Sequence, residues 1–138
     1  MEAVRFAFPG PERDRLVDAV LKGEKTATSS LLAEWLLDDQ ELPAVGDRRE
    51  VLDSGDNPVA VIETTAVDVI RLGDVDLALA HEEGEGFESV AEWRWAHERF
   101  WTEEVIPRLP TSMAGPLNDG AKIVVVRFRL VPNTQIPG

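Results

Sequence analysis

The residue types best suited to chemistry are gathered in one polar segment, residues 23–30 (GEKTATSS). If burial lowers the pKa of Lys25, the neutral amine can take the proton of a nearby hydroxyl such as that of Thr28. If Lys25 stays charged, it can bind a phosphate or a developing oxyanion. On composition alone, the simpler interpretation is a solvated loop in which Ser29 or Ser30 caps a following helix.

A second segment, residues 81–86 (HEEGEG), places three carboxylates beside two glycines. Such a group can orient a base or bind a ligand amine, and crowding of like charges can raise the pKa of one carboxyl toward neutral. An exposed acidic turn is the simpler interpretation. A calcium loop is a further alternative, but the spacing does not match an EF-hand.

A third group is aromatic and lies in a predicted helix. Trp93, His97, Phe100 and Trp101 recur at helical spacing and share one face, which is typical of core packing. Trp95 lies off this face, so it is the better candidate for stacking on a base. We interpret His97 as a hydrogen-bonded, half-buried residue rather than as a catalyst.

The charge balance argues against binding to a long duplex. Asp and Glu outnumber Lys and Arg by 26 to 14, which gives a formal net charge of −12. Affinity for duplexes comes largely from neutralising phosphates with basic residues, whereas a nucleoside or a short single strand needs little of it. Arg127 and Arg129 can contact phosphate, or they can pair with acidic neighbours.

Composition narrows the function classes further. The chain has no cysteine and only two histidines, which excludes disulfides, thiolate catalysis and a His-rich metal site. We expect no cofactor, and any metal would need oxygen ligands. No run approaches the roughly 18 apolar residues of a membrane span, and the N-terminus does not resemble a signal peptide. We therefore expect a cytoplasmic protein with no membrane partner, and no oligomeric state is predicted.

The elements that position these groups follow from periodicity and turn residues. Alternation predicts a strand over residues 3–8, with Val4, Phe6 and Phe8 on one face. Helical spacing predicts a helix over 11–22, with Pro11 in its first turn and Gly23 as its C-cap. A short apolar helix is expected over 31–37. Two strands, 48–53 and 58–71, are expected to form a hairpin through the turn at 54–57.

The second half of the chain is more helical. We predict a helix over 74–83 and another over 89–106, which Ser89 and Glu92 cap and Pro107 stops. A loop over 107–120 and a last strand over 121–131 follow, with Val124, Val126, Phe128 and Leu130 on one face of the strand. This order is not a regular βαβ alternation, so we expect an α+β fold with a small β-barrel or curved mixed sheet and flanking helices.

In their order and spacing, these segments resemble the ASCH domain family. Gly23, Lys25 and Thr28 match its G-x-K-x-x-T signature. The match continues through residues 29–31, 42–47 (LPAVGD), 59–67 (VAVIETTAV), 83–86 with Trp93, His97 and Phe100, and finally 126–128 (VRF). It covers residues from about 3 to 131, which is nearly the whole chain.

The resemblance implies a PUA-like fold in a single domain over residues 1–138, with a core over about 3–131 and a tail over 132–138. It also implies a cleft suited to RNA or modified nucleosides. Some small family members remove the acetyl group from N4-acetylcytidine with a lysine, a threonine and a glutamate. Other members have been described as ribonucleases.

Carried over to this chain, the resemblance makes Lys25 the base and Thr28 the nucleophile. The glutamate should fall within residues 82–85, with Glu83 first, Glu85 second and Glu63 as an outside candidate. The expected substrate-binding residues are Gly23, Thr26, Ser29, Ser30, Glu85 and Trp95.

Position 30 departs from the deacetylase signature. Ser30 stands where that signature often has an arginine, and a serine supplies no charged bidentate donor. A noncatalytic RNA-binding module, or a ribonuclease acting on short single-stranded RNA, is therefore the alternative to acyl amide hydrolysis.

Overall fold

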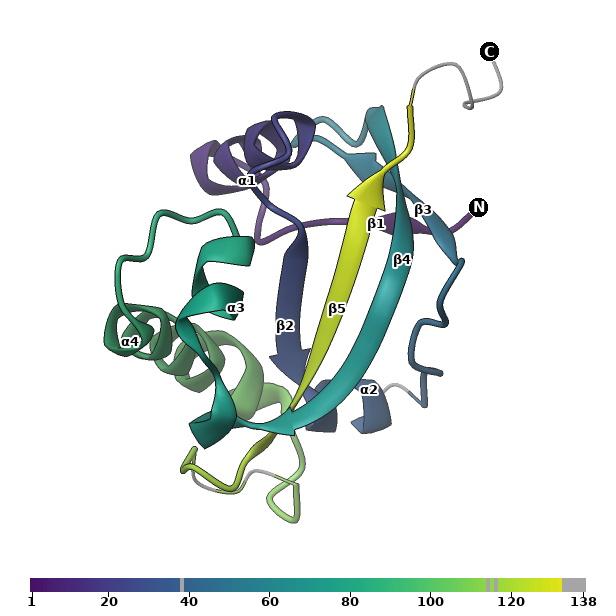
Figure 1. Ribbon diagram of the computed structural model, residues 1–138. Helices are drawn as coiled ribbons and strands as arrows, with labels where there is room; N and C mark the ends of the chain where they lie inside the picture. The colour runs from purple at the N-terminus through teal and green to yellow at the C-terminus, as the bar shows by residue number, and fades with distance from the viewer. Residues whose placement is uncertain (38, 114, 116, 133–138) are drawn as a thin grey trace.

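A strongly curved sheet forms the centre of the computed structural model, which describes residues 1–37, 39–113, 115 and 117–132 (Figure 1). The five strands are β1 (Ala3–Val4), β2 (Ala27–Leu31), β3 (Arg48–Leu52), β4 (Pro58–Arg71) and β5 (Lys122–Leu130). Their order is β1-β3-β4-β5-β2, and only the β1–β3 pair is parallel. Among the described residues β1 does not pair with β2, so the predicted curved mixed sheet is observed in an open form rather than as a closed barrel.

The longest strands, β4 and β5, carry the curvature. Both are rich in Val and Ile, whose branched side chains suit a strand. Their antiparallel register shifts between Thr64 and Ala66. Such a bulge bends and twists a strand pair, and Figure 1 shows β4 bent along its length.

The helices are α1 (Pro11–Leu21), α2 (Leu32–Leu37), α3 (Leu77–Glu82) and α4 (Val90–Phe100). A short 3-10 turn, Leu72–Asp74, precedes α3. In Figure 1, α3 and α4 lie beside β2, whereas α1 lies across the end of the sheet near the start of β2. Among the described residues, no helix is both long enough and apolar enough to cross a bilayer.

Helix α1 begins as predicted and ends one residue earlier than predicted, at Leu21. Pro11 occupies its first turn. At its other end Gly23 has a φ of +77°, its N–H donates to Val20 O, and the N–H of Glu24 donates to Ala19 O. This is a Schellman motif, which favours glycine at the left-handed position. The motif turns the chain sharply from α1 toward Lys25.

Two apolar clusters hold the layers together. One includes Trp93 and Trp101 with Ile123 and Val125 of β5. The other joins α1 to the sheet and includes Phe128 of β5. Because alternate residues of a strand face opposite sides, β5 contributes to a core on each face of the sheet. Leu130, predicted on the same face of the strand as Phe128, is exposed near the end of the strand.

Four predicted elements differ from the structure, one of them the helix over 74–83, which is shortened to α3 (Leu77–Glu82). The strand over 3–8 ends at Val4, because Ala7 adopts a left-handed φ of 56° and Phe8 points into solvent. The polar segment over 24–30 is not a loop throughout, since Ala27–Leu31 pairs with β5 as a strand. Strand pairing of this kind depends on a distant partner, which a local polar pattern does not reveal.

The predicted helix over 89–106 is also built differently. Ser89 caps α4 as predicted, with its hydroxyl accepting from the N–H of Glu92. After α4 the chain continues through a π-helical turn, Trp101–Val105, and a 3-10 turn, Ile106–Arg108. Pro107 therefore falls within the first turn of the 3-10 segment. Of the predicted loop over 107–120 and tail over 132–138, residues 114, 116 and 133–138 lie outside the described residues.

Candidate functional site

A cleft of about 160 Å³ runs along the free edge of β2. Its walls come from the turn after β1, from α1, from residues 25–29, from the loop after α3 and from α4. A larger hollow of about 310 Å³ lies beside α2, but among the described residues Lys122 is the only titratable group in its wall and the rest is almost entirely apolar. The smaller cleft holds the candidate chemistry, because a buried lysine, a histidine, three glutamates and two hydroxyl-bearing residues line it.

Lys25 is buried at the base of this cleft, with 3% of its surface exposed. Its Nζ donates to the backbone oxygens of Ala27 (2.9 Å) and Glu83 (3.1 Å). Burial lowers the pKa of Lys25, although the charges of the Glu83 and Glu85 carboxylates oppose this shift. A neutral amine has two N–H groups, so it can keep both hydrogen bonds and still offer a lone pair.

Gly84 allows the loop after α3 to approach Lys25 closely. A Cβ added at Gly84 would lie 2.7 Å from Lys25 Cβ and 2.9 Å from its backbone nitrogen. Gly84 also has a φ of +70°, which favours glycine. The N–H of Thr26 donates to Glu82 O at 2.7 Å and fastens the loop to the chain beside Lys25.

The Glu83 carboxylate is the most enclosed acid of the site, with 2% of the residue exposed. It accepts hydrogen bonds from the Ser29 hydroxyl (3.0 Å to Oε2), from Trp93 Nε1 and from His97 Nε2 (3.2 Å). Burial alone would raise the pKa of Glu83. The hydrogen bond from His97 and the positive charges of His97 and Lys25 outweigh burial, so the pKa lies below its ordinary value.

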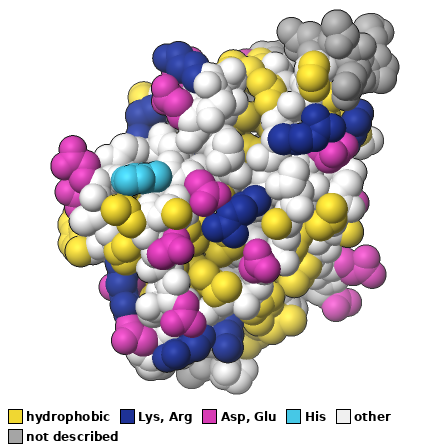
Figure 2. Space-filling model, in the orientation of Figure 1, with side chains coloured by type: hydrophobic (Ala, Val, Ile, Leu, Met, Phe, Trp, Pro, Cys, Tyr) yellow, Lys and Arg dark blue, Asp and Glu magenta, His cyan; other side chains and the backbone are white. Residues whose placement is uncertain are grey.

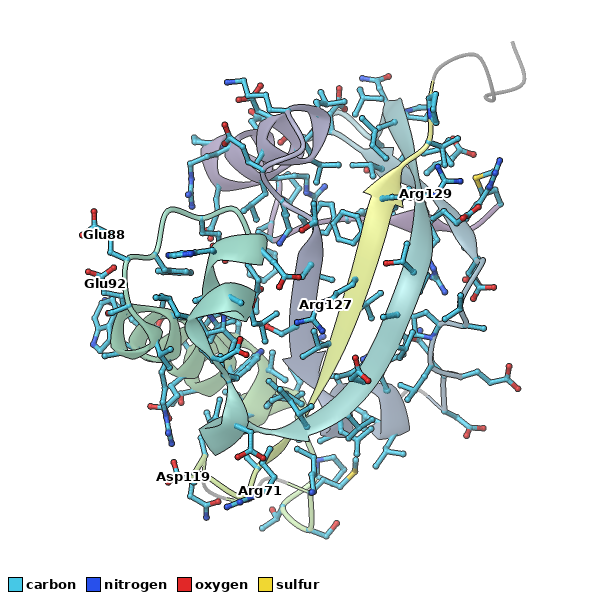
Figure 3. The ribbon with its side chains drawn as sticks, in the orientation of Figure 1. Arg71, Glu88, Glu92, Asp119, Arg127 and Arg129 are labelled. Atoms are coloured by element: carbon cyan, nitrogen blue, oxygen red, sulfur yellow. The ribbon has the colours of Figure 1, made fainter. Side chains whose placement is uncertain are left out.

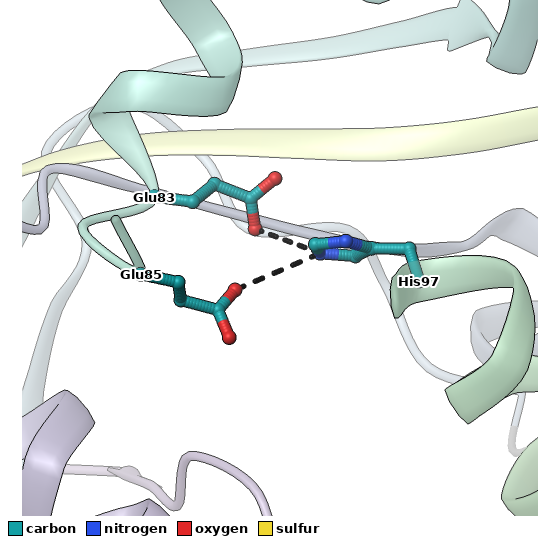
Figure 4. A group of neighbouring side chains, drawn as sticks. All are labelled: Glu83, Glu85 and His97. Atoms are coloured by element: carbon teal, nitrogen blue, oxygen red, sulfur yellow. Dashed lines mark hydrogen bonds and ion pairs between the residues drawn. The ribbon is translucent and has the colours of Figure 1, made fainter. Parts of the chain in front are cut away.

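His97 is the cationic partner of Glu83. Its Nδ1 lies 2.8 Å from the carbonyl oxygen of Trp93, which can only accept, so Nδ1 carries a proton. Its Nε2 faces Glu83 Oε1 at 3.2 Å and Glu85 Oε2 at 3.9 Å (Figure 4). Because ionised carboxylates also only accept, Nε2 is protonated too. Burial opposes this charge, but Glu83 and Glu85 outweigh it and raise the pKa of His97.

Glu85 completes the cluster from the same loop as Glu83. Burial raises the pKa of its carboxyl, although His97 and Lys25 oppose the shift. One ligand atom each of Glu83, Glu85 and His97 lie within 4.8 Å of one another, a set that could hold a metal ion. The oxygens of Glu83 already accept from Ser29, Trp93 and His97. We therefore describe the cluster as a hydrogen-bonded ion pair.

Two hydroxyls line the cleft, those of Thr28 and Ser29. Since successive side chains of a strand point to opposite faces, they flank the edge of β2 from its two sides. Phe128 N donates to Thr26 O, so the ladder turns the backbone groups of Ala27 and Ser29 away from β5. The bond from Lys25 to the Ala27 oxygen agrees with this geometry.

The structure brings together five of the predicted site residues, namely Lys25, Thr28, Ser29, Glu83 and Glu85. The others do not line the cleft. Gly23 ends α1, the backbone of Thr26 bonds to Glu82 and Phe128, the hydroxyl of Ser30 accepts from Trp35, and Trp95 lies on the opposite side of α4 from His97.

The outside candidate, Glu63, is paired with arginines on the sheet. It accepts from Arg48 (3.0 Å) and Arg129 (3.2 Å) and does not line the cleft. Sequence reasoning did not place Phe6, Ala7 or Phe100 in the cleft, because the fold brings them there from two distant segments.

The arginines of the last strand pair with acids. Figure 3 shows Arg127 and Arg129 projecting from the same side of β5. Arg127 bonds to Glu82 at 2.7 Å, and Arg129 bonds to Glu63. Figure 2 shows basic and acidic side chains interspersed on this face rather than a continuous basic patch. Of the two interpretations offered by the sequence, pairing with acidic neighbours is the one observed.

Comparison with known proteins agrees with this architecture. A sequence model of the ASCH domain matches residues 4–132. The structure is similar to that of protein EF3133 from Enterococcus faecalis V583, of family DUF984, with 28% identity, a TM-score of 0.81 and coverage of 95% of this chain and 76% of that one.

The structure is also similar to an ASCH domain from Lactobacillus crispatus JV V101, with 26% identity, a TM-score of 0.80 and coverage of 94% of this chain and 78% of that one. No curated protein matches the chain. These similarities confirm the predicted α+β, PUA-like fold.

Proposed function

Because this chain belongs to the ASCH domain family, which indicates an RNA-related function, we propose that it acts on RNA or modified nucleosides. Most concretely, it hydrolyses an acyl amide such as that of N4-acetylcytidine. The observation that carries this proposal is the buried amine of Lys25, whose pKa is lowered by burial, in a cleft that is also lined by Thr28, Glu83 and Glu85.

The size and charge of the cleft suit such a substrate. Pockets for drug-sized ligands have volumes of roughly 300–1,000 Å³. A cleft of about 160 Å³ is smaller and fits one base better than several nucleotides. Carboxylates outnumber basic groups on its walls, since Glu12, Glu83 and Glu85 line the cleft together with Lys25 and His97. An uncharged acylated base avoids the repulsion that a buried phosphate would meet there.

In the proposed reaction, Thr28 Oγ1 attacks the acyl carbon and its proton passes to the neutral amine of Lys25. The N–H of Ser29, on the free edge of β2, stabilises the oxyanion. When the C–N bond breaks, Lys25 returns the proton to the departing exocyclic amine of the base. Water then hydrolyses the acyl ester on Thr28, with Lys25 as base again, and releases the carboxylic acid.

Glu83 supports this reaction from two sides. Its backbone oxygen holds Lys25 Nζ, and its carboxylate binds the Ser29 side chain on the edge strand. The family resemblance assigns the glutamate carboxylate the role of holding Lys25. In the proposed mechanism that task falls to the Glu83 carbonyl, and the carboxylate acts on Lys25 through its charge.

Binding of short single-stranded RNA without hydrolysis is the second candidate function. The observation that favours it is at position 30, where Ser30 bonds to Trp35 outside the cleft. No side chain at this position therefore supplies the charged donor that the deacetylase signature often has. A ribonuclease, with Lys25 stabilising the charge of the transition state, is the catalytic form of this alternative.

One comparison separates these functions. Purified protein and a Lys25→Ala variant are each incubated with N4-acetylcytidine and with short single-stranded RNA. We expect acetate release by the wild type and none by the variant. Salt-dependent retention of RNA without turnover would support the second candidate. If neither occurs, or if the variant behaves as the wild type does, the proposed role of Lys25 is wrong.

A further inference from the structure

Two exposed phenylalanine rings stand together beside the cleft. Phe8 is 59% exposed and Phe100 is 39% exposed, and their ring centroids are 6.2 Å apart with planes tilted by 51°. Phe100 belongs to the cleft wall and lies one helical turn beyond His97 on α4. Single exposed apolar residues are ordinary, but two aromatic rings in contact at the rim of a polar cleft suggest a binding role.

A buried arginine fixes the turn that places Phe8 there. Arg13 of α1 is only 4% exposed, and it donates through Nε to Phe6 O (3.0 Å) and through an Nη to Ala7 O (2.8 Å). A buried guanidinium is costly unless its donors are satisfied. Both of these hydrogen bonds are to the short segment that leads to Phe8.

The same turn contains a strained residue. Ala7 has a φ of 56°, a left-handed conformation that is uncommon and strained outside glycine. Such strain persists where surrounding contacts enforce it, and it is concentrated at binding and catalytic sites. Here the strained turn directs Phe6 inward, where its ring centroid is 5.2 Å from Lys25 Nζ, and leaves Phe8 in solvent against Phe100.

We propose that Phe8 and Phe100 form an aromatic lip that stacks on the planar base of the ligand bound in the cleft. The inference deepens the proposed function, because it assumes a ligand that carries a nucleobase. Stacking on an aromatic ring is tolerant of base identity, because every base has a π-face. The lip selects heteroaromatic acyl amides over aliphatic ones, while the groups around Lys25 act on the acyl group itself.

The test compares ring-removing and ring-replacing variants. Phe8→Ala and Phe100→Ala remove each ring, whereas Phe8→Leu and Phe100→Leu keep apolar bulk without a π-system. Trp95→Ala, an exposed aromatic on the other side of α4, is the matched control. The dissociation constants of N4-acetylcytidine and of cytidine are measured by calorimetry. Each Phe variant should weaken binding about 5- to 100-fold, and Trp95→Ala should leave it unchanged.

The outcomes separate this inference from the proposed function. If the wild type binds cytidine through the lip but releases no acetate, the proposed lip is supported and the hydrolase proposal is wrong. If acetate release persists with unchanged affinity in both Phe8→Ala and Phe100→Ala, the lip is wrong and the hydrolase proposal stands. Failure of the wild type to bind either nucleoside overturns the lip.

Sedimentation of the same variants tests a different explanation for the exposed rings, namely an interface between copies of the chain. If the Phe8 and Phe100 variants change the oligomeric state while leaving nucleoside affinity unchanged, the two rings form an interface between copies of the chain. That result also overturns the lip. Thermal melting of each variant shows whether it is folded, and the Leu variants, which preserve apolar contact, provide the measurement if an Ala variant does not fold.

Discussion

At the scale of single residues, the site depends on how burial redistributes protons among four groups. Burial lowers the pKa of Lys25 and raises that of Glu85, whereas the contact between Glu83 and His97 favours the charged form of each. Opposite shifts in neighbouring groups are a common arrangement for acid and base roles. In this cleft they leave Lys25 as the group best able to accept a proton.

The pH dependence of hydrolysis tests the role of Lys25. If the neutral amine is the base, the rate should rise with pH through the lowered pKa of Lys25, with a midpoint below the ordinary value of 10.5. Lys25→Arg keeps the charge but cannot lose its proton, so it should lose about 10²- to 10⁴-fold in rate at every pH. Acetate release followed from pH 5 to 10 measures this, and a flat wild-type profile would contradict it.

Stability should show the titration of the His97–Glu83 pair. The pKa of His97 lies above its ordinary 6.5, so its contribution is full below that value and is lost as pH rises through the raised pKa. The pKa of Glu83 lies below its ordinary 4.5, so its contribution is full above that value and is lost as pH falls through the lowered pKa. Both contributions are full between pH 4.5 and 6.5.

His97→Gln tests this window, because glutamine retains a donor without titrating. The variant should lose about 1–3 kcal/mol of unfolding free energy inside the window and less above it. Urea unfolding at a series of pH values gives the difference. Lys25 and Glu85 face the pair in both proteins, so their own titration largely cancels. A deficit that grows as pH rises would rule out a protonated His97.

At the scale of elements, the cleft is assembled where an edge strand, a loop and a helix meet. β2 leaves its free edge open to the cleft, the loop after α3 docks against Lys25, and α4 brings His97 to that loop. The Glu83 carboxylate binds this loop to Ser29, Trp93 and His97, and Gly84 allows its backbone to approach Lys25 closely.

Two glycines of this loop form a matched pair of tests. Both have left-handed φ values, +70° at Gly84 and +83° at Gly86, but only a Cβ at Gly84 would meet neighbouring atoms. Gly86→Ala should therefore cost only the backbone strain, roughly 1–2 kcal/mol. Gly84→Ala should cost roughly 1–3 kcal/mol more and should reduce acetate release, because Glu83 and Lys25 move apart. Thermal melting with an activity assay distinguishes them, and equal effects would contradict the close approach.

The sequence predicts best the helices and strands whose own residues show a clear periodicity. The strand over 58–71 has the predicted bounds, and α1 differs by one residue. The hydroxyl-rich sequence over 24–30 suggests a loop rather than the edge strand Ala27–Leu31, because it lacks an apolar face and its partner β5 is distant in the chain. The left-handed Ala7 and the exposed Phe8 were missed because Arg13, a residue of the next helix, enforces that turn.

The sequence likewise predicts the members of the candidate site that lie in its motifs, but not those that the packing of distant elements brings in. Lys25 and Glu83 were proposed from a resemblance in motif order, and the fold brings them into contact through the Glu83 backbone oxygen. The part taken by His97 in the cluster, and by Phe100 in the cleft, required the packing of α4 against the loop after α3. The spacing of residues in the sequence does not show how a helix and a loop pack against each other.

At the scale of the whole molecule, the net charge of −12 limits which nucleic acids can bind. Four arginines of the sheet bond to carboxylates, namely Arg48 and Arg129 to Glu63, Arg49 to Glu2 and Arg127 to Glu82. Binding a duplex would break these pairs as well as bring phosphates to an acidic surface. A ligand without phosphate meets neither cost, because it enters the cleft through shape and hydrogen bonding.

The salt dependence of ligand binding tests whether the net charge of the protein excludes duplex nucleic acids. A protein that makes 6–10 phosphate contacts loses about 10³- to 10⁵-fold in affinity between 50 and 200 mM salt, because bound counterions are released. N4-acetylcytidine carries no phosphate, so its dissociation constant should change less than about twofold over that range. A fluorescent duplex should show no binding at either concentration in an anisotropy titration. Tight, steeply salt-dependent binding of that duplex would require a basic surface that the pairing of Arg127 and Arg129 with acids argues against, and it would move the functional site away from the cleft around Lys25.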